Sequence, residues 1–247
     1  MATIDIALEK FDTSKDKVRR EIREGFFHPD GSLRVAENEL RAWIGDRAVD
    51  ELKLVLQLSA VVAKAGQLLP AHILAQVTDQ IADEARHFAI LRGLVPAEAQ
   101  SQIDQKVHEL PAVLADDIGW QQQLTAIEAG NPFGALLDVN IVHEGYSAAA
   151  IEELAGVPFD DIRQAYAEIG ADEERHHETG RELLVWLAGA DEHAGIAAAT
   201  MEQTQGRAGE GTAMSWSWPA ASVVAGAHER ATSGNAMSWS WPVANQA

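Results

Sequence analysis

The chain contains the five-residue pattern D-E-x-R-H twice, at Asp83–His87 and again at Asp172–His176. Each copy holds a Glu and a His three positions apart, and on a helix this spacing puts both side chains on one face. Two such helices packed against each other would bring two imidazoles and two carboxylates to one place. The repeat therefore predicts a helical fold in which these two segments face each other.

A cluster of this kind suits a pair of metal ions, and a carboxylate-rich site with two nitrogen ligands suits iron that reacts with O₂. Each motif helix would then need one more carboxylate from the helix before it. Glu51 and Glu144 fit, because each lies on an apolar face at helical spacing, 33 and 29 residues before a motif Glu. The predicted metal ligands are Glu51, Glu84, His87, Glu144, Glu173 and His176.

Apolar residues recur three and four positions apart up to about residue 200, which predicts an all-α fold. Pro and Gly mark the ends of the long segments. The nearly forty residues between the second and third long helices contain two further helical segments, at 98–109 and 117–128. We predict long helices at 36–66, 71–94, 132–156 and 159–190. The chain would consist of an N-terminal helical extension (1–35), a helical domain (36–200) that contains these four helices, and a C-terminal tail (201–247).

The composition excludes several classes of protein. The formal net charge of −19 argues against a nucleic-acid partner, because phosphates would be repelled. The absence of cysteine excludes disulfides and thiolate metal sites. The sequence contains no run of eighteen apolar residues, so it predicts no membrane span. The first residues do not resemble a secretion signal. We therefore expect a soluble, cytoplasmic protein.

The motifs and their spacing resemble the ferritin-like non-haem di-iron carboxylate superfamily, over about residues 36–190. D-E-x-R-H is more similar to its oxygen-activating members than to ferritins. The resemblance implies a four-helix bundle with a long crossover connection and a centre of two iron ions, with manganese as the alternative metal. It also implies that Asp83 and Asp172 accept hydrogen bonds from the His of the opposite motif, and that Arg86 and Arg175 balance the carboxylate charge.

The function implied by this resemblance is that of an oxidoreductase: an O₂-dependent oxygenase or oxidase acting on a small molecule or a peptide, supplied with electrons by a donor protein. The alternative is a ferroxidase or iron-storage protein, and a homodimer is an open alternative to a monomer. Leu91 occupies the position at which reductase small subunits of this superfamily carry a radical Tyr, so we do not expect a stored tyrosyl radical. Ala148 replaces the Thr of the monooxygenases.

A second repeat lies in the tail, where A-M-S-W-S-W-P occurs at 213–219 and again at 236–242. The surrounding residues are rich in Gly, Ala and Ser, which predicts a flexible segment with little packed structure. Two aromatic anchors on such a segment suit a docking peptide. They equally suit a peptide substrate attached to its own enzyme, or tryptophans that pack on the helical domain. The tryptophans in question are Trp216, Trp218, Trp239 and Trp241.

Deletion of residues 206–247 is expected to leave a folded, metal-binding helical domain, because the composition of this segment favours no core. Intact mass spectrometry after treatment with iron, reductant and O₂ then separates the two functions of the tail. A mass change localised to the repeats identifies a substrate, whereas an unaltered tail that captures a partner protein identifies a docking peptide. Loss of the fold on truncation would show that the tryptophans belong to the core.

Overall fold

The computed structural model describes residues 15–189, and every regular element in this range is a helix. The predicted all-α class is confirmed for this part of the chain. The tail, with Trp216, Trp218, Trp239 and Trp241, lies outside it. The elements are a helix at residues 15–26, then α2 (Glu37–Ala65), a 3₁₀ turn η1 (Gly66–Leu68), α3 (Ala71–Gly93), α4 (Ala97–Asp116), α5 (Ile118–Glu128), α6 (Phe133–Leu137), a π-helical segment η2 (Asp138–His143), α7 (Glu144–Leu154) and α8 (Asp160–Gly189).

Local sequence signals account for the helix boundaries. α3 and α4 each begin directly after a proline, Pro70 and Pro96, whose fixed φ favours a helix start and whose missing N–H is not needed there. At the start of α2 the Glu39 carboxylate accepts a hydrogen bond from the Ala36 backbone N–H at 2.9 Å. In α5 the Asp117 side chain accepts one from the Trp120 N–H at 3.0 Å.

The helix predicted over 132–156 is present, but it is not one regular α-helix. Residues 138–143 form a π-helical turn between α6 and α7. Such turns insert one residue into the helical ladder and rotate the residues that follow. Within the turn the Asn140 side-chain amide donates to the Leu136 carbonyl at 3.1 Å. Sequence periodicity misses this change of register, because four of the six residues of the segment are buried, including Asn140 and His143.

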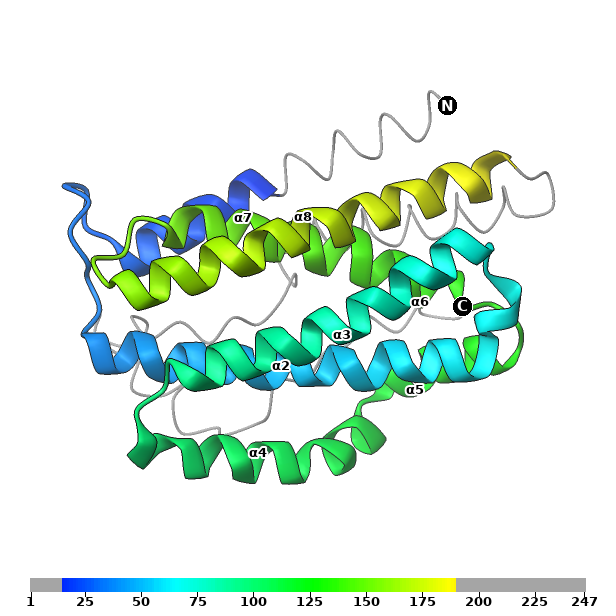
Figure 1. Cartoon of the computed structure of the whole chain (residues 1–247), viewed down its shortest axis with the longest axis horizontal. Coiled ribbons are helices and arrows are strands. Elements are labelled where there is room, and N and C mark those ends of the chain that lie inside the picture. The colour runs from blue at the N-terminus through cyan, green and yellow to red at the C-terminus, as the bar shows by residue number, and fades with distance from the viewer. Residues whose placement is uncertain (1–14, 190–247) are drawn as a thin grey trace, which may run out of the picture.

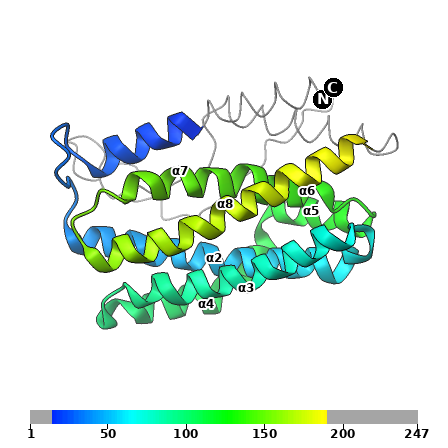
Figure 2. The ribbon, with the colours of Figure 1, turned by 45° about the horizontal axis from the view of Figure 1, so that its top comes forward.

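The long helices pack so that the two motif helices meet. α2 lies against α3, α7 and the π-helical segment lie against α8, and α3 lies against α8. Figures 1 and 2 show these helices running alongside one another, with α4 on the outer side of α2. Completely buried side chains fill the space between them, among them Ile44, Leu58, Ile73, Ile141 and Leu184. The contact of α3 with α8 places the two D-E-x-R-H segments in one interior.

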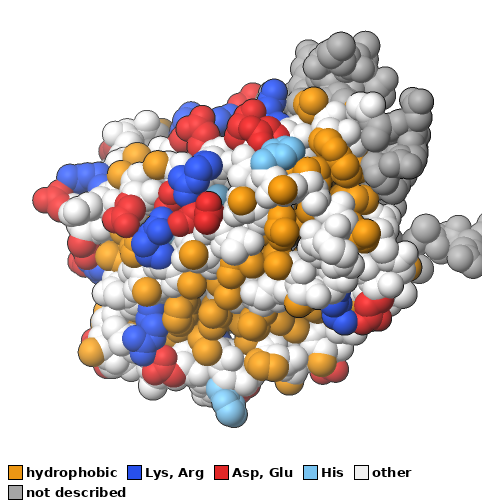
Figure 3. Space-filling model, turned by 45° about the vertical axis from the view of Figure 1, so that its right-hand side comes forward, with side chains coloured by type: hydrophobic (Ala, Val, Ile, Leu, Met, Phe, Trp, Pro, Cys, Tyr) orange, Lys and Arg blue, Asp and Glu red, His pale blue; other side chains and the backbone are white. Residues whose placement is uncertain are grey.

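The surface carries apolar as well as charged areas. Figure 3 shows one face on which hydrophobic side chains gather between charged groups. The large hydrophobic residues exposed within the described range include Ile118 and Val185, at 70% and 64%. Apolar areas of this kind are typical of contact surfaces, and the homodimer stays a prediction.

Among the described helices, none combines the length and apolar character needed to cross a membrane.

A substitution at Gly180 on α8 would test the close approach of α8 to the π-helical segment. A Cβ built at this position would lie 2.8 Å from Cβ and 2.9 Å from the backbone C of Asn140. Gly180→Ala is therefore expected to lower the free energy of unfolding by about 1–3 kcal/mol, the usual effect of overpacking. Chemical denaturation measures it, with Gly134→Ala as control, because a Cβ there meets nothing within 4 Å. Equal stabilities of the two variants would contradict the packing described here.

Candidate metal centre

The six residues predicted as ligands come together between four helical segments. Glu51 lies on α2, Glu84 and His87 lie on α3, Glu144 begins α7, and α8 carries the other two, Glu173 and His176. All of these side chains except Glu51 are at most 2% exposed, whereas Glu51 is partly exposed. Four carboxylates in such an interior need cationic partners, because burial of an uncompensated charge is costly.

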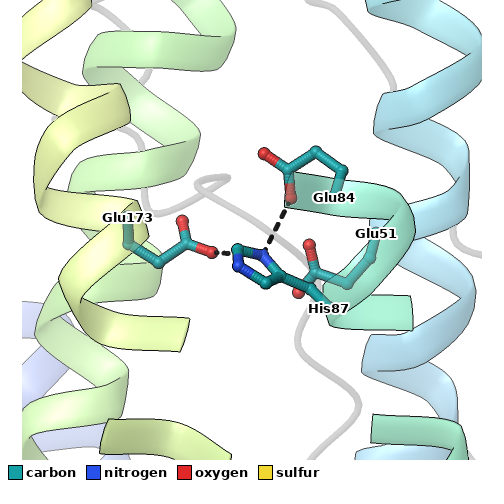
Figure 4. Close-up of side chains that lie close together, drawn as sticks. All are labelled: Glu51, Glu84, His87 and Glu173. Atoms are coloured by element: carbon teal, nitrogen blue, oxygen red, sulfur yellow. Dashed lines mark hydrogen bonds and ion pairs between the residues drawn. The ribbon is translucent and has the colours of Figure 1, made fainter. Parts of the chain in front are cut away.

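The ligand atoms form two groups, and within each group they lie within 4.8 Å of one another. Glu84 belongs to both groups and therefore lies between them. Figure 4 shows the first group: Glu51 extends from α2 and Glu173 from α8 toward the two α3 side chains. The first group consists of Glu51, Glu84, His87 and Glu173, and the second of Glu84, Glu144 and His176. Each group combines carboxylate oxygens with one imidazole nitrogen and could hold a metal ion.

Both histidines turn their Nδ1 atoms toward the carboxylates. His87 Nδ1 lies 3.2 Å from Glu84 Oε2 and 3.4 Å from Glu173 Oε1. His176 Nδ1 lies 3.2 Å from Glu84 Oε1 and 3.8 Å from Glu144 Oε2. A neutral imidazole whose Nδ1 is unprotonated can bind a metal ion through that atom. The two Nδ1 atoms are thus in equivalent positions on either side of Glu84.

The Nε2 atoms point the other way, each to the aspartate of the opposite motif. His87 Nε2 lies 3.1 Å from Asp172 Oδ2, and His176 Nε2 lies 3.2 Å from Asp83 Oδ2. A carboxylate can only accept, so each Nε2 carries a proton, and Nδ1 is the atom through which the neutral ring would bind a metal ion. The crossed arrangement expected for Asp83 and Asp172 is the one found.

Arg86 and Arg175 contact these aspartates rather than the four glutamates. Arg86 donates to Asp83 Oδ1 at 2.7 Å and also to Asp172. Arg175 donates to Asp83 Oδ2 at 2.5 Å and pairs with Asp172 Oδ1 at 2.7 Å. The four side chains form a closed ring above the histidines, with both guanidiniums about half exposed. The arginines therefore fix the aspartates that orient the imidazoles.

Burial and mutual repulsion shape the pKa values of the metal-free cluster. Burial raises the pKa values of Glu51, Glu144 and Glu173, and nearby carboxylates raise them further. Burial also raises the pKa of Glu84, but hydrogen bonds with His176 and His87 outweigh it and lower this pKa overall. For His87, burial lowers the pKa, yet its contacts with Glu173 and Glu84 raise it to about 11. Without a metal ion, protons take the place of the missing cations.

Two buried carboxylate oxygens of the cluster, Glu144 Oε2 and Glu173 Oε2, have no hydrogen-bond partner. Buried polar atoms nearly always have partners, so two such oxygens in one cluster indicate room for a ligand. Two carboxylate oxygens and an imidazole nitrogen are suitable donors for a divalent iron or manganese ion. The residues present therefore fit the predicted metals by their chemistry.

Two buried polar side chains near the cluster, Gln80 and Tyr166, were not predicted from the sequence. Gln80, 1% exposed, lies on α3 one turn before Glu84 and contacts two of the ligands. Its position on the apolar face of Ile73 and Val77 is the signal that could have revealed it. Tyr166 on α8 is also buried, and its hydroxyl has no hydrogen-bond partner.

The histidines beside the ligands are buried as well. His177 Nδ1 lies 3.1 Å from the Asn140 carbonyl oxygen, which gives this ring a structural partner outside the cluster. His143 lies at the end of the π-helical segment and lines a small cavity with Asp117, Trp120 and Asp138. Burial lowers the pKa of His143 to about 4, so its ring is neutral at ordinary pH. Neither histidine belongs to the two ligand groups described above.

The comparisons with known proteins give no match: no protein-family model, no characterised protein and no solved structure is significantly similar to this chain.

Replacement of Asp83 or Asp172 by Ala is expected to leave the fold intact and to weaken metal binding by about 10–100-fold, because the imidazole loses the group that orients it. Metal titration with thermal melts measures both effects. Asp79→Ala is the matched control, since Asp79 is an exposed aspartate one turn earlier on α3. Unchanged metal affinity in both aspartate variants would contradict an orienting role.

Proposed function

We propose that this chain is a ferritin-like protein that binds two iron ions and uses them, with O₂, to oxidise an organic or peptide substrate. One observation carries the proposal: four glutamates and two histidines form two adjoining ligand groups that share Glu84, almost entirely inside the protein. An interior of this composition is unfavourable without cations. Manganese is the alternative metal.

A four-helix bundle with a long crossover is the architecture that we propose for this centre. The pairing of α2 with α3 and of α7 with α8 supports it, as does the contact of α3 with α8. α4 and α5 would form the crossover, since they join the first pair to the second. In such bundles a Glu comes from each of two helices and a Glu-x-x-His from each of the other two, which is the distribution found here.

The chain's own residues hold, orient and enclose the reacting centre. The Nδ1 atoms of His87 and His176 and the four glutamates would bind the two ions. Asp172 and Asp83 keep the Nε2 protons in place, so the imidazoles remain neutral ligands. The packed apolar core excludes water from most of the cluster. The two bound Fe(II) ions would supply electrons for the reduction of O₂.

We prefer an oxygenase or oxidase to iron storage because both motifs have the sequence D-E-x-R-H. The Asp and Arg side chains of the two motifs together form one ring of ion pairs. Such an enzyme would need an electron-donor protein to return the irons to Fe(II). The two tail repeats remain a proposed substrate or docking peptide.

Mixing the anaerobic Fe(II) form with O₂ is expected to consume about one O₂ per two irons, with two irons bound per chain, because residues 15–189 form two ligand groups. An oxygen electrode and iron analysis measure this. His176→Ala should lose most of the bound iron, whereas His72→Ala, which alters an exposed histidine of α3, should match the parent. Uptake of tens of ferric ions per chain would identify a storage protein instead.

A further inference from the structure

Within residues 15–189, the neutral side chain of Gln80 is hydrogen-bonded to two of the candidate ligands. Its Nε2 donates to Glu144 Oε1 at 2.7 Å and to Glu84 Oε1 at 3.2 Å. In the metal-bound state that we propose, both carboxylates are ionised and can only accept, so the amide nitrogen is the atom that suits both. Its Oε1 is buried without a hydrogen-bond partner. The side chain is 1% exposed, and burial of a polar group with half of its bonding capacity unused is unfavourable.

The same position in the other half of the molecule is apolar. Gln80 lies four residues before the motif residue Glu84, and the residue four before Glu173 is Ile169, which is also buried. The two motifs match at Asp, Glu, Arg and His, but the helices that carry them differ one turn earlier. No amide on α8 therefore corresponds to Gln80, and the two halves of the centre are unequal.

The Gln80 side chain contacts more members of the second ligand group than of the first. The second group has three members, and Gln80 holds two of them, Glu84 and Glu144. The first group has four members, of which Gln80 contacts Glu84 alone. Glu144 accepts from Gln80 at 2.7 Å, whereas His176 Nδ1, the other polar group of the second group near it, lies 3.8 Å from Glu144 Oε2. The Gln80 amide is thus the closer of these two contacts, and it helps to fix Glu144 in the second group.

We propose that Gln80 is a positioning residue that holds Glu84 and Glu144 in place for the second metal ion and so makes the two metal positions unequal in affinity. The inference rests on the proposed dinuclear centre. A hydrogen bond to a charged carboxylate is stronger than one between neutral groups, and partners of ligating carboxylates commonly change metal affinity by about 10–100-fold. Loss of the amide would free Glu144 to rotate, while the first group would keep Glu51, His87 and Glu173.

The test is an anaerobic titration of the full-length chain with Co²⁺, followed by calorimetry and by the visible absorption of the bound ion. The parent is expected to bind two ions in two resolved steps. Gln80→Met keeps the size and flexibility of the side chain but removes its donor. It should weaken the second step by about 10–100-fold, change the absorption that grows in that step, and leave the first step within about threefold.

Two further variants serve as controls for the result with Gln80→Met. Gln76→Met removes a glutamine amide from the same helix, whose partner Glu182 lies outside the cluster, and should behave as the parent. Gln80→Asn keeps an amide but withdraws it by one methylene. If Gln80→Met fails to fold, this variant should still weaken the second step selectively.

A variant in which both steps weaken equally, or neither changes, would overturn the role of Gln80. A parent that binds fewer than two Co²⁺ ions would instead overturn the proposed dinuclear centre, and it would do so before any variant is made.

Discussion

Mutual repulsion among Glu51, Glu84, Glu144 and Glu173 is the constraint on which the rest of this structure depends. The four carboxylates converge on one site, and three of them are almost completely buried. Burial and neighbouring charges raise the pKa values of Glu51, Glu144 and Glu173, so protons neutralise these three in the metal-free protein. Bound cations would stabilise the ionised cluster, which supports the proposed metal centre.

The crossed contacts between the motifs explain how the cluster keeps its geometry. Asp83 orients His176, Asp172 orients His87, and the two arginines clamp both aspartates. Each motif therefore needs the other for its own histidine to be correctly placed. Since each His and its Asp partner lie on different helices, the imidazoles are held in this orientation only when α3 packs on α8. The guanidiniums stay about half exposed, so the ring also connects the buried histidines to the surface.

Much of this organisation could be predicted from the sequence, because it rests on local signals. The prolines at 70, 96, 132 and 158 mark helix boundaries, and the Glu-His spacing within each motif fixes a helical face. The π-helical turn before Glu144 could not be predicted, since it packs closely against Gly180, which is distant in sequence. Gln80 was missed for a similar reason. A glutamine on an apolar face shows its partners only when the opposing helix is in place.

The two halves are alike in their ligands and unlike in their surroundings. Glu51 comes from a regular helix and keeps part of its side chain exposed, whereas Glu144 follows a π-helical turn, is completely buried and accepts from Gln80. Because the π-helical turn changes the register of the residues that follow it, the two groups receive these carboxylates from differently built helices. The repeat in the sequence thus supplies the same ligand types to two groups whose surroundings differ.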